Sequence, residues 1–97
     1  MNVRFLAPAQ KELDEAVEYY ESQLPGLGIQ FLSEIREAVE NVKRFPHAWH
    51  RFSENTRRYR TKRFPYGIIY QFLDHEILIV AIAHLHREPG YWCDRAK

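Results

Sequence analysis

The sequence contains a single cysteine, Cys93, and no long uninterrupted apolar run. One cysteine excludes a disulfide within the chain and suits a protein of the reducing cytoplasm. Met1 is not followed by the apolar stretch of a signal peptide, and no segment reaches the length of a membrane-spanning helix. These absences predict a soluble cytoplasmic protein that does not enter a membrane.

The sequence also lacks the short motifs that mark several common catalytic sites. It has no glycine-rich phosphate loop, no paired-cysteine metal motif and no nucleophile elbow. Ser33 and Ser53 stand in no recognisable catalytic context. We therefore expect neither a bound metal nor a cofactor.

Charge is nearly balanced over the 97 residues but is unevenly distributed. The net charge is +1, whereas residues 1–50 carry 5 Lys and Arg against 8 Asp and Glu, and residues 51–97 carry 9 against 5. A chain of this length is expected to form one domain, residues 1–97, around one modest core. The positive second half indicates a surface for a polyanion or for an acidic protein segment.

A short strand and an amphipathic helix are predicted at the start of the chain. Val3, Phe5 and Leu6 indicate the strand, and Pro8 stands where a helix can begin. The apolar stripe of the helix follows three- and four-residue spacings through Ala9, Leu13, Ala16, Val17, Tyr20 and Leu24. The opposite face is acidic and is interpreted as a solvated surface, with Glu12, Asp14, Glu15, Glu18 and Glu21.

A second amphipathic helix is predicted over residues 30–44, after a break at Pro25 and Gly26. Lys43 and Arg44 fall in its last turn, where cations complement the helix dipole. Two such helices joined by a short turn are typical of an antiparallel hairpin.

Three strands are predicted in the second half of the chain, after a loop over residues 46–56. Trp49 in this loop is expected to cover the core. The strands span residues 57–64, 68–73 and 77–85, and the tight connection at 74–76 favours antiparallel pairing. The predicted order is therefore strand, helix, helix and three strands.

A basic run opens the first of these three strands. Arg58, Arg60 and Lys62 alternate onto one predicted strand face, and Arg57 and Arg63 onto the other. Cations in such a row can follow a phosphate backbone or receive the acidic residues of a partner segment. The alternative is a charged edge strand that discourages unwanted strand pairing.

The end of the last strand carries two histidines, His84 and His86, which share a predicted strand face. With Cys93 as the only nearby additional ligand, a zinc site is not expected. Imidazole titrates near neutrality, so an acid or base role is open. The alternative is that one histidine packs at the rim of the sheet and the other is solvated.

Arg87 and Tyr91 follow these histidines and are further candidates. Arg87 can stabilise a phosphate in a transition state, and Tyr91 can exchange a proton or stack on a base. The alternative is a C-terminal clasp, in which Pro89 and Gly90 turn the chain so that Tyr91 and Trp92 fold back onto the sheet.

Four segments together resemble the RelE/ParE superfamily of toxins from bacterial type II toxin–antitoxin (plasmid stabilisation) systems. They are residues 16–20 (AVEYY), 45–46 (FP), 63–70 (RFPYGIIY) and 79–92 (IVAIAHLHREPGYW). The resemblance implies an α+β fold, with an N-terminal strand and an antiparallel helical hairpin packed on a mostly antiparallel twisted sheet. It also implies a cognate antitoxin, which would form a hetero-oligomer with the toxin and block it. An acidic antitoxin segment would complement the basic half of this chain.

The two branches of this superfamily imply different activities. RelE-like members cleave mRNA in the ribosomal A site without a metal, whereas ParE-like members poison DNA gyrase and are not nucleases. RelE-like members carry an arginine in the strand after the turn, where residues 66–70 here offer glycine and isoleucines. This departure favours the gyrase inhibitor.

The resemblance leaves two alternatives to the gyrase inhibitor. In a ribosome-dependent nuclease, phosphate would be held by Arg60, Lys62 and Arg87. Protons would be moved by His84 or His86, and Tyr91 would position a base. In an inactive relative, the domain would only bind its antitoxin and, through it, operator DNA.

Overall fold

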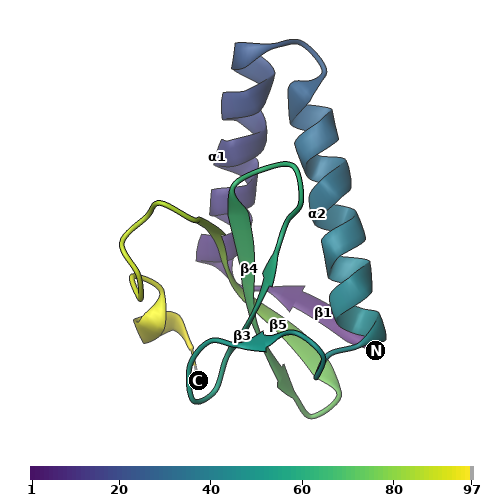
Figure 1. The fold of residues 1–97 in the computed structure, drawn as a ribbon, viewed down its shortest axis with the longest axis vertical. Coiled ribbons are helices and arrows are strands. Elements are labelled where there is room, and N and C mark those ends of the chain that lie inside the picture. Colours follow the sequence, from purple (N-terminus) through teal and green to yellow (C-terminus); the bar gives the residue numbers. More distant parts are fainter. Residues whose placement is uncertain (97) are drawn as a thin grey trace.

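The structure is a computed structural model that describes residues 1–96. Two helices form an antiparallel hairpin that packs along a five-stranded sheet and extends beyond it (Figure 1). The elements in chain order are β1 (Asn2–Phe5), α1 (Ala7–Gln23), α2 (Leu27–Arg44), β2 (His50–Arg51), β3 (Arg57–Arg60), β4 (Tyr66–Leu73), β5 (Glu76–His84) and the 3-10 helix η1 (Cys93–Arg95). The predicted α+β fold is confirmed.

The strands lie in the order β1-β5-β4-β3-β2. The pair β1 and β5 is parallel, and the other three pairs are antiparallel. The two-residue turn between β4 and β5 places Asp74 and His75 at φ 51° and 59°, as a type I′ hairpin turn requires. The predicted tight connection is thus confirmed, and β5 lies between β1 and β4.

Strand β2 lies inside the predicted loop 46–56, so that interpretation was wrong at His50 and Arg51, which pair with Arg58 and Arg57. Two residues are too few to show an alternating pattern, and both side chains are exposed. Only the neighbouring β3 makes this short segment a strand.

Helix α2 begins at Leu27, three residues before the predicted start, because the hairpin turn is held by a carboxylate of α1. Glu21 accepts hydrogen bonds from the backbone N–H groups of Gly26 and Gly28, at 2.9 and 3.1 Å. A Cβ atom at Gly28 would lie 2.6 Å from the carbonyl oxygen of Val17. Glycine at this position therefore lets the two helices approach closely.

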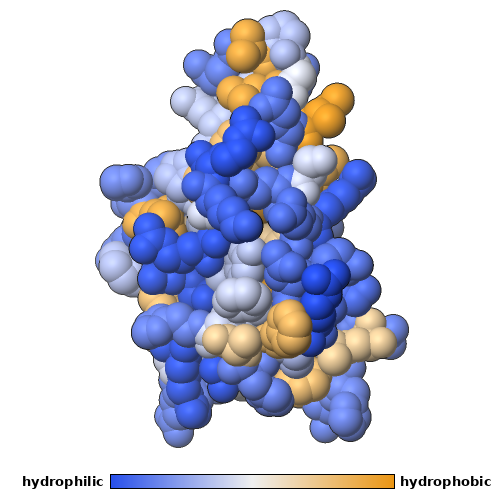
Figure 2. Space-filling view, turned by 45° about the vertical axis from the view of Figure 1, so that its right-hand side comes forward, coloured by the Kyte–Doolittle hydropathy of each residue, from blue (hydrophilic) through white to orange (hydrophobic). Residues whose placement is uncertain are grey.

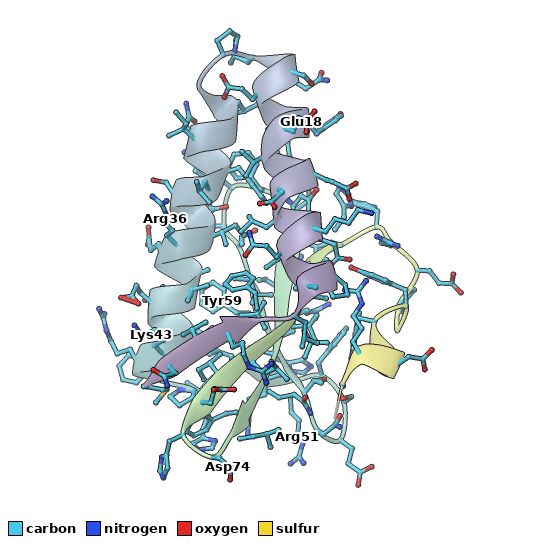
Figure 3. All side chains as sticks on the ribbon, turned by 180° about the vertical axis from the view of Figure 1, so that it is seen from behind. Glu18, Arg36, Lys43, Arg51, Tyr59 and Asp74 are labelled. Carbon is cyan, nitrogen blue, oxygen red and sulfur yellow. The ribbon has the colours of Figure 1, made fainter. Side chains whose placement is uncertain are left out.

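The main core lies between the helices and the sheet. Aromatic rings are prominent in it: Tyr20, Phe31 and Phe64 have ring centroids 4.9–5.2 Å apart. Trp49 packs against this core, as predicted, and Tyr59 reaches α2, where its hydroxyl accepts a hydrogen bond from Asn41 (Figure 3). The covered face of the sheet is thus continuous with the hairpin.

The face of the sheet opposite the helices, called the open face below, carries a smaller apolar cluster. It consists of Ile69, Leu78, Val80, Ala81, Ala83 and Trp92. Trp92 belongs to the C-terminal segment, residues 87–96, which folds back beside the sheet (yellow in Figure 1). This segment and Phe52 pack against the cluster, whose members are all buried.

The surface is largely hydrophilic, with scattered apolar patches (Figure 2). Leu24 and Ile29, at the end of the hairpin, are exposed. None of the helices within residues 1–96 is long and apolar enough to cross a membrane.

Candidate functional site

The predicted basic strand is shorter than expected, since β3 ends at Arg60 and not at residue 64. The chain turns after Thr61, whose hydroxyl donates a hydrogen bond of 2.5 Å to the carbonyl oxygen of Phe64. The Glu34 carboxylate of α2 accepts hydrogen bonds from the backbone N–H groups of Arg63 and Phe64. Lys62 and Arg63 therefore lie in a turn anchored to α2, and Lys62 does not continue the row of Arg58 and Arg60.

The five cations of the basic run consequently point to different surroundings. Arg57 donates a hydrogen bond of 2.9 Å to the carbonyl oxygen of Trp49, and Arg63 donates one of 2.7 Å to the Gln30 side chain. Arg60 and Lys62 are exposed. Because Tyr59 belongs to the helix-side core, its neighbours Arg58 and Arg60 fall on the open face.

Arg58 is the most enclosed of the cations on the open face. Its guanidinium carbon lies 4.3 Å from the centre of the Phe52 ring, which stacks on Trp92 at 5.7 Å. Burial lowers the pKa of Arg58, and the charge of Arg60 lowers it further. A cavity of about 60 Å³ lies beside it, between β3, β4 and the C-terminal segment.

The two histidines lie together at the rim of the sheet. The backbone N–H of His86 donates a hydrogen bond of 3.1 Å to Nδ1 of His84, and the Tyr66 ring packs against His84 at 5.1 Å. His84 is half-buried and His86 is exposed, which matches the alternative of one packed and one solvated histidine. Residues 1–96 contain no group of three or more His, Cys, Asp or Glu that could hold a metal.

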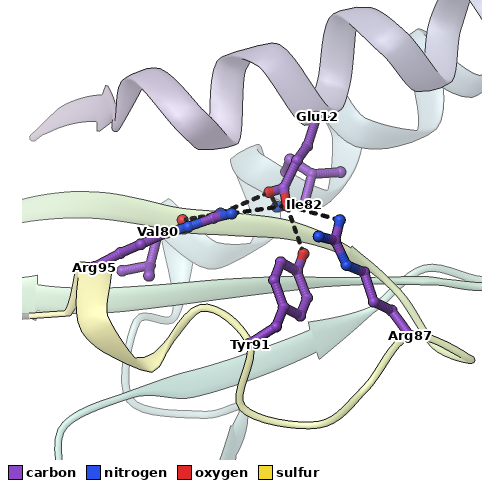
Figure 4. A network of polar contacts seen from close by, with 6 residues as sticks. All are labelled: Glu12, Val80, Ile82, Arg87, Tyr91 and Arg95. Carbon is purple, nitrogen blue, oxygen red and sulfur yellow. Dashed lines mark hydrogen bonds and ion pairs between the residues drawn. The ribbon is translucent and has the colours of Figure 1, made fainter.

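The C-terminal candidates converge on Glu12 of α1, which is half-buried (Figure 4). The Tyr91 hydroxyl donates a hydrogen bond of 2.6 Å to its carboxylate, and Arg95 donates two, of 2.9 and 3.2 Å. Arg87 lies 3.6 Å from the same carboxylate, which also accepts the backbone N–H of Ile82 at 3.0 Å. We call these contacts the Glu12 clamp.

The clamp also determines the protonation of Tyr91. Burial raises the pKa of Tyr91, and the hydrogen bond to Glu12 and its negative charge raise it further. Arg87 lies over the Tyr91 ring, with its guanidinium carbon 3.8 Å from the ring centre. The phenol is therefore a protonated hydrogen-bond donor, and the predicted alternative of a C-terminal clasp describes its position.

Sequence reasoning missed three residues of this region, Glu12, Phe52 and Arg95. Glu12 was assigned to a solvated acidic face, but its side chain is only 11% exposed. Its partners lie about 70 or more positions later in the chain, beyond the reach of any helical periodicity. Phe52 stood in a predicted loop, and no motif marks it.

Comparison with known protein families identifies one match. Residues 3–89 match the family described as ParE toxin of type II toxin-antitoxin system, parDE. A solved structure titled "Chromosomal ParDE TA system from P. aeruginosa" has a similar fold, with a TM-score of 0.78 and 21% sequence identity. The alignment covers 89% of this chain and 97% of that one. No curated protein matches the sequence.

Proposed function

The chain belongs to the ParE toxin family of type II toxin–antitoxin systems, and we propose that it poisons DNA gyrase by binding, without chemistry of its own. Membership of the family makes it the toxin of a module whose second component is an antitoxin. The choice of gyrase as target rests on the ParE branch, whose members act on that enzyme.

The observation that carries the proposal is the Glu12 clamp. A nuclease of the RelE type would need Arg87 and Tyr91 free to reach a phosphate and a base. Here the Tyr91 hydroxyl donates a hydrogen bond of 2.6 Å to Glu12, and Arg87 lies between that carboxylate and the Tyr91 ring. An efficient general acid or base has a pKa near the working pH, whereas the pKa of Tyr91 is raised above its ordinary value.

The strand after the turn supports the same proposal. Gly67, Ile68 and Ile69 of β4 are buried, and none of them supplies the arginine that RelE-like members carry there. The cations of the open face are thus suited to bind a macromolecule.

We propose that Arg58, Arg60 and Lys62 form the surface that the antitoxin occupies. Positive potential on this surface would speed encounter with an acidic segment. In this proposal the antitoxin neutralises the toxin by covering the surface that gyrase would otherwise contact. Arg57 is held by the loop before β2, and Arg63 is held by α2. These two residues would therefore contribute charge to the surface but few direct contacts with the antitoxin.

A supercoiling assay with purified gyrase and toxin tests the target. We expect loss of supercoiling and a trapped cleavage complex, and we expect relief when Arg58 and Arg60 are both changed to Met. Lys11 and Arg36 are exposed cations on the helices, so the Lys11→Met/Arg36→Met variant is the matched control and should inhibit like the parent.

Two results would overturn the proposal. Normal supercoiling at high toxin concentration, together with cleavage of mRNA on programmed ribosomes, would establish the nuclease instead. Unimpaired growth on expression without antitoxin would establish the inactive relative.

A further inference from the structure

Arg58 carries the one buried side-chain nitrogen or oxygen within residues 1–96 that has no hydrogen-bond partner, its Nε atom. A buried donor without a partner costs free energy, and a partly buried cation without a counter-ion costs more. None of the ion pairs in the described part of the chain includes Arg58. The free domain therefore leaves the Nε–H group of Arg58 without an acceptor, which a suitable ligand could supply.

The cavity beside Arg58 limits what that ligand can be. Its volume of about 60 Å³ corresponds to roughly four or five water molecules, which is the size of one side chain and too small for a nucleotide. Its walls are mostly apolar, and include Phe52, Leu85 and Trp92. Glu88 lines it too, without an ion pair to Arg58.

We propose that this cavity, the Arg58 pocket, receives a single glutamate side chain from an acidic segment of the antitoxin. The carboxylate would accept hydrogen bonds from Nε and a terminal nitrogen of Arg58, the bidentate arrangement that guanidinium groups favour. The methylene groups of the glutamate would pack between Phe52 and Trp92. The choice of the antitoxin as source rests on the proposed function.

A glutamate suits this pocket better than a nucleic-acid phosphate does. Apolar walls favour methylene groups, whereas a phosphate diester in this cavity would exchange much of its hydration for apolar contacts. A backbone-binding surface also needs several exposed cations in a row, and Lys62 does not continue the row of Arg58 and Arg60. His84 and Arg87 also line the cavity, beside Phe52 and Trp92, so a carboxylate with an apolar stem matches both kinds of wall.

Gly67 helps to position Arg58. A Cβ atom added there would lie 3.0 Å from Cδ and 3.1 Å from Cγ of Arg58. Those distances are shorter than ordinary contact, so the Arg58 stem must move if residue 67 gains a side chain. Because Gly67 has no side chain, the stem of Arg58 can lie directly against β4.

The binding of a capped glutamate, N-acetyl-glutamate methylamide, can be followed in ¹H–¹⁵N spectra of the whole protein. We expect the Nε–H signal of Arg58 and the indole N–H signal of Trp92 to shift and saturate with this probe. The capped glutamine analogue should leave both unchanged. Equal shifts with dimethyl phosphate would overturn the proposal in favour of a nucleic-acid backbone, and no shift with the glutamate probe would overturn it outright.

Variants of the same protein separate a specific pocket from a merely positive surface. Arg58→Lys keeps the charge but loses the planar fork, so the affinity for the probe should fall roughly tenfold to a hundredfold. Arg60→Met loses a charge outside the pocket and should bind almost as the parent does. If Arg58→Lys binds like the parent, or Arg60→Met loses as much, the pocket is not the site.

Gly67→Ala provides a second variant that leaves Arg58 itself intact. It should weaken probe binding, and parent-like binding would contradict the role of the Arg58 stem. None of these measurements involves gyrase or growth, so failure of the pocket and failure of the proposed target give different results.

Discussion

The covered face and the open face of the sheet are held by different kinds of contact. On the covered face, side chains from both helices and from β3, β4 and β5 interlock in one core. On the open face, a smaller cluster is capped by Trp92, and the segment that carries Trp92 is held by the Glu12 clamp. The comparison teaches that one face is stabilised by many redundant contacts and the other depends on a single carboxylate.

This difference fits the proposed roles of the two faces, in which the covered face is a scaffold and the open face binds a partner. Burial in a close-packed core gives a stable scaffold, because each side chain has many neighbours. A binding face must keep some groups incompletely satisfied so that a partner can complete them, and Arg58 is such a group. In the proposed function, the open face is therefore the less stable face and the one that binds partners.

The largest expected effect comes from one substitution made on each face. Phe31 is fully buried and Phe52 is half-buried. Phe31→Ala should lower the free energy of unfolding by about 3–5 kcal/mol, and Phe52→Ala by roughly half as much because it is partly exposed. Urea unfolding measures both, and equal losses would contradict the comparison.

The next effect concerns the clamp. Glu12→Gln keeps the shape but removes the charge that Arg87 and Arg95 face, so it should destabilise the protein by about 2–3 kcal/mol. Compared with the parent, the variant should show faster hydrogen exchange at the amides of residues 91–95, and this increase should precede any increase in β4. Glu15 is exposed on the same helix, and Glu15→Gln should change stability by less than about 0.5 kcal/mol. Equal exchange in Glu12→Gln and the parent would show that the clamp does not hold the segment.

The smallest effect at neutral pH concerns Tyr70 on the covered face, whose pKa also predicts a dependence of stability on alkaline pH. Burial raises the pKa of Tyr70 to about 12, whereas the phenol in the unfolded chain titrates near 10. Between these values unfolding releases a proton, so stability should fall as the pH rises from about 10 to about 12. Tyr66, with its pKa raised to about 12 by burial, should add to this fall.

Tyr70→Phe should reduce that alkaline slope and cost about 1 kcal/mol at neutral pH, through the lost hydrogen bond to the Pro46 carbonyl. Denaturant unfolding over this pH range measures both. Tyr19 is exposed, so Tyr19→Phe should keep the parent slope. An unchanged slope in Tyr70→Phe would mean that the phenol does not contribute.

Features within single elements could be predicted from the sequence. The apolar stripe through Leu13 and Ala16 predicted α1 by its helical period, and the continuous apolar run from Ile77 predicted β5 by its length and composition. The order of the elements and the α+β class followed. Errors arose at boundaries, where Glu21 and Glu34 hold turns by contacts that no local pattern encodes.

The candidate site was less predictable than the fold. Counting cations identified the basic run, but not that Arg58 alone among the five lines a cavity with Phe52 and Trp92. That cavity depends on the return of the C-terminal segment, and the return depends on Glu12 in the first helix. Contacts over such sequence distances follow from the tertiary structure, so only the coordinates could reveal them. The binding role of the five cations remains a prediction.

The parallel pairing of β1 with β5 has a consequence for the synthesis and folding of this toxin. Asn2 pairs with Glu76 and Phe5 with Ile79. During synthesis, β1 is the first strand to be made, but it can pair only after β5 has been made. A nascent chain that stops before residue 76 has neither β5 nor the C-terminal segment that Glu12 would hold. Its β1 strand therefore has no strand to pair with. We therefore expect translation products that end before residue 76 to be non-toxic.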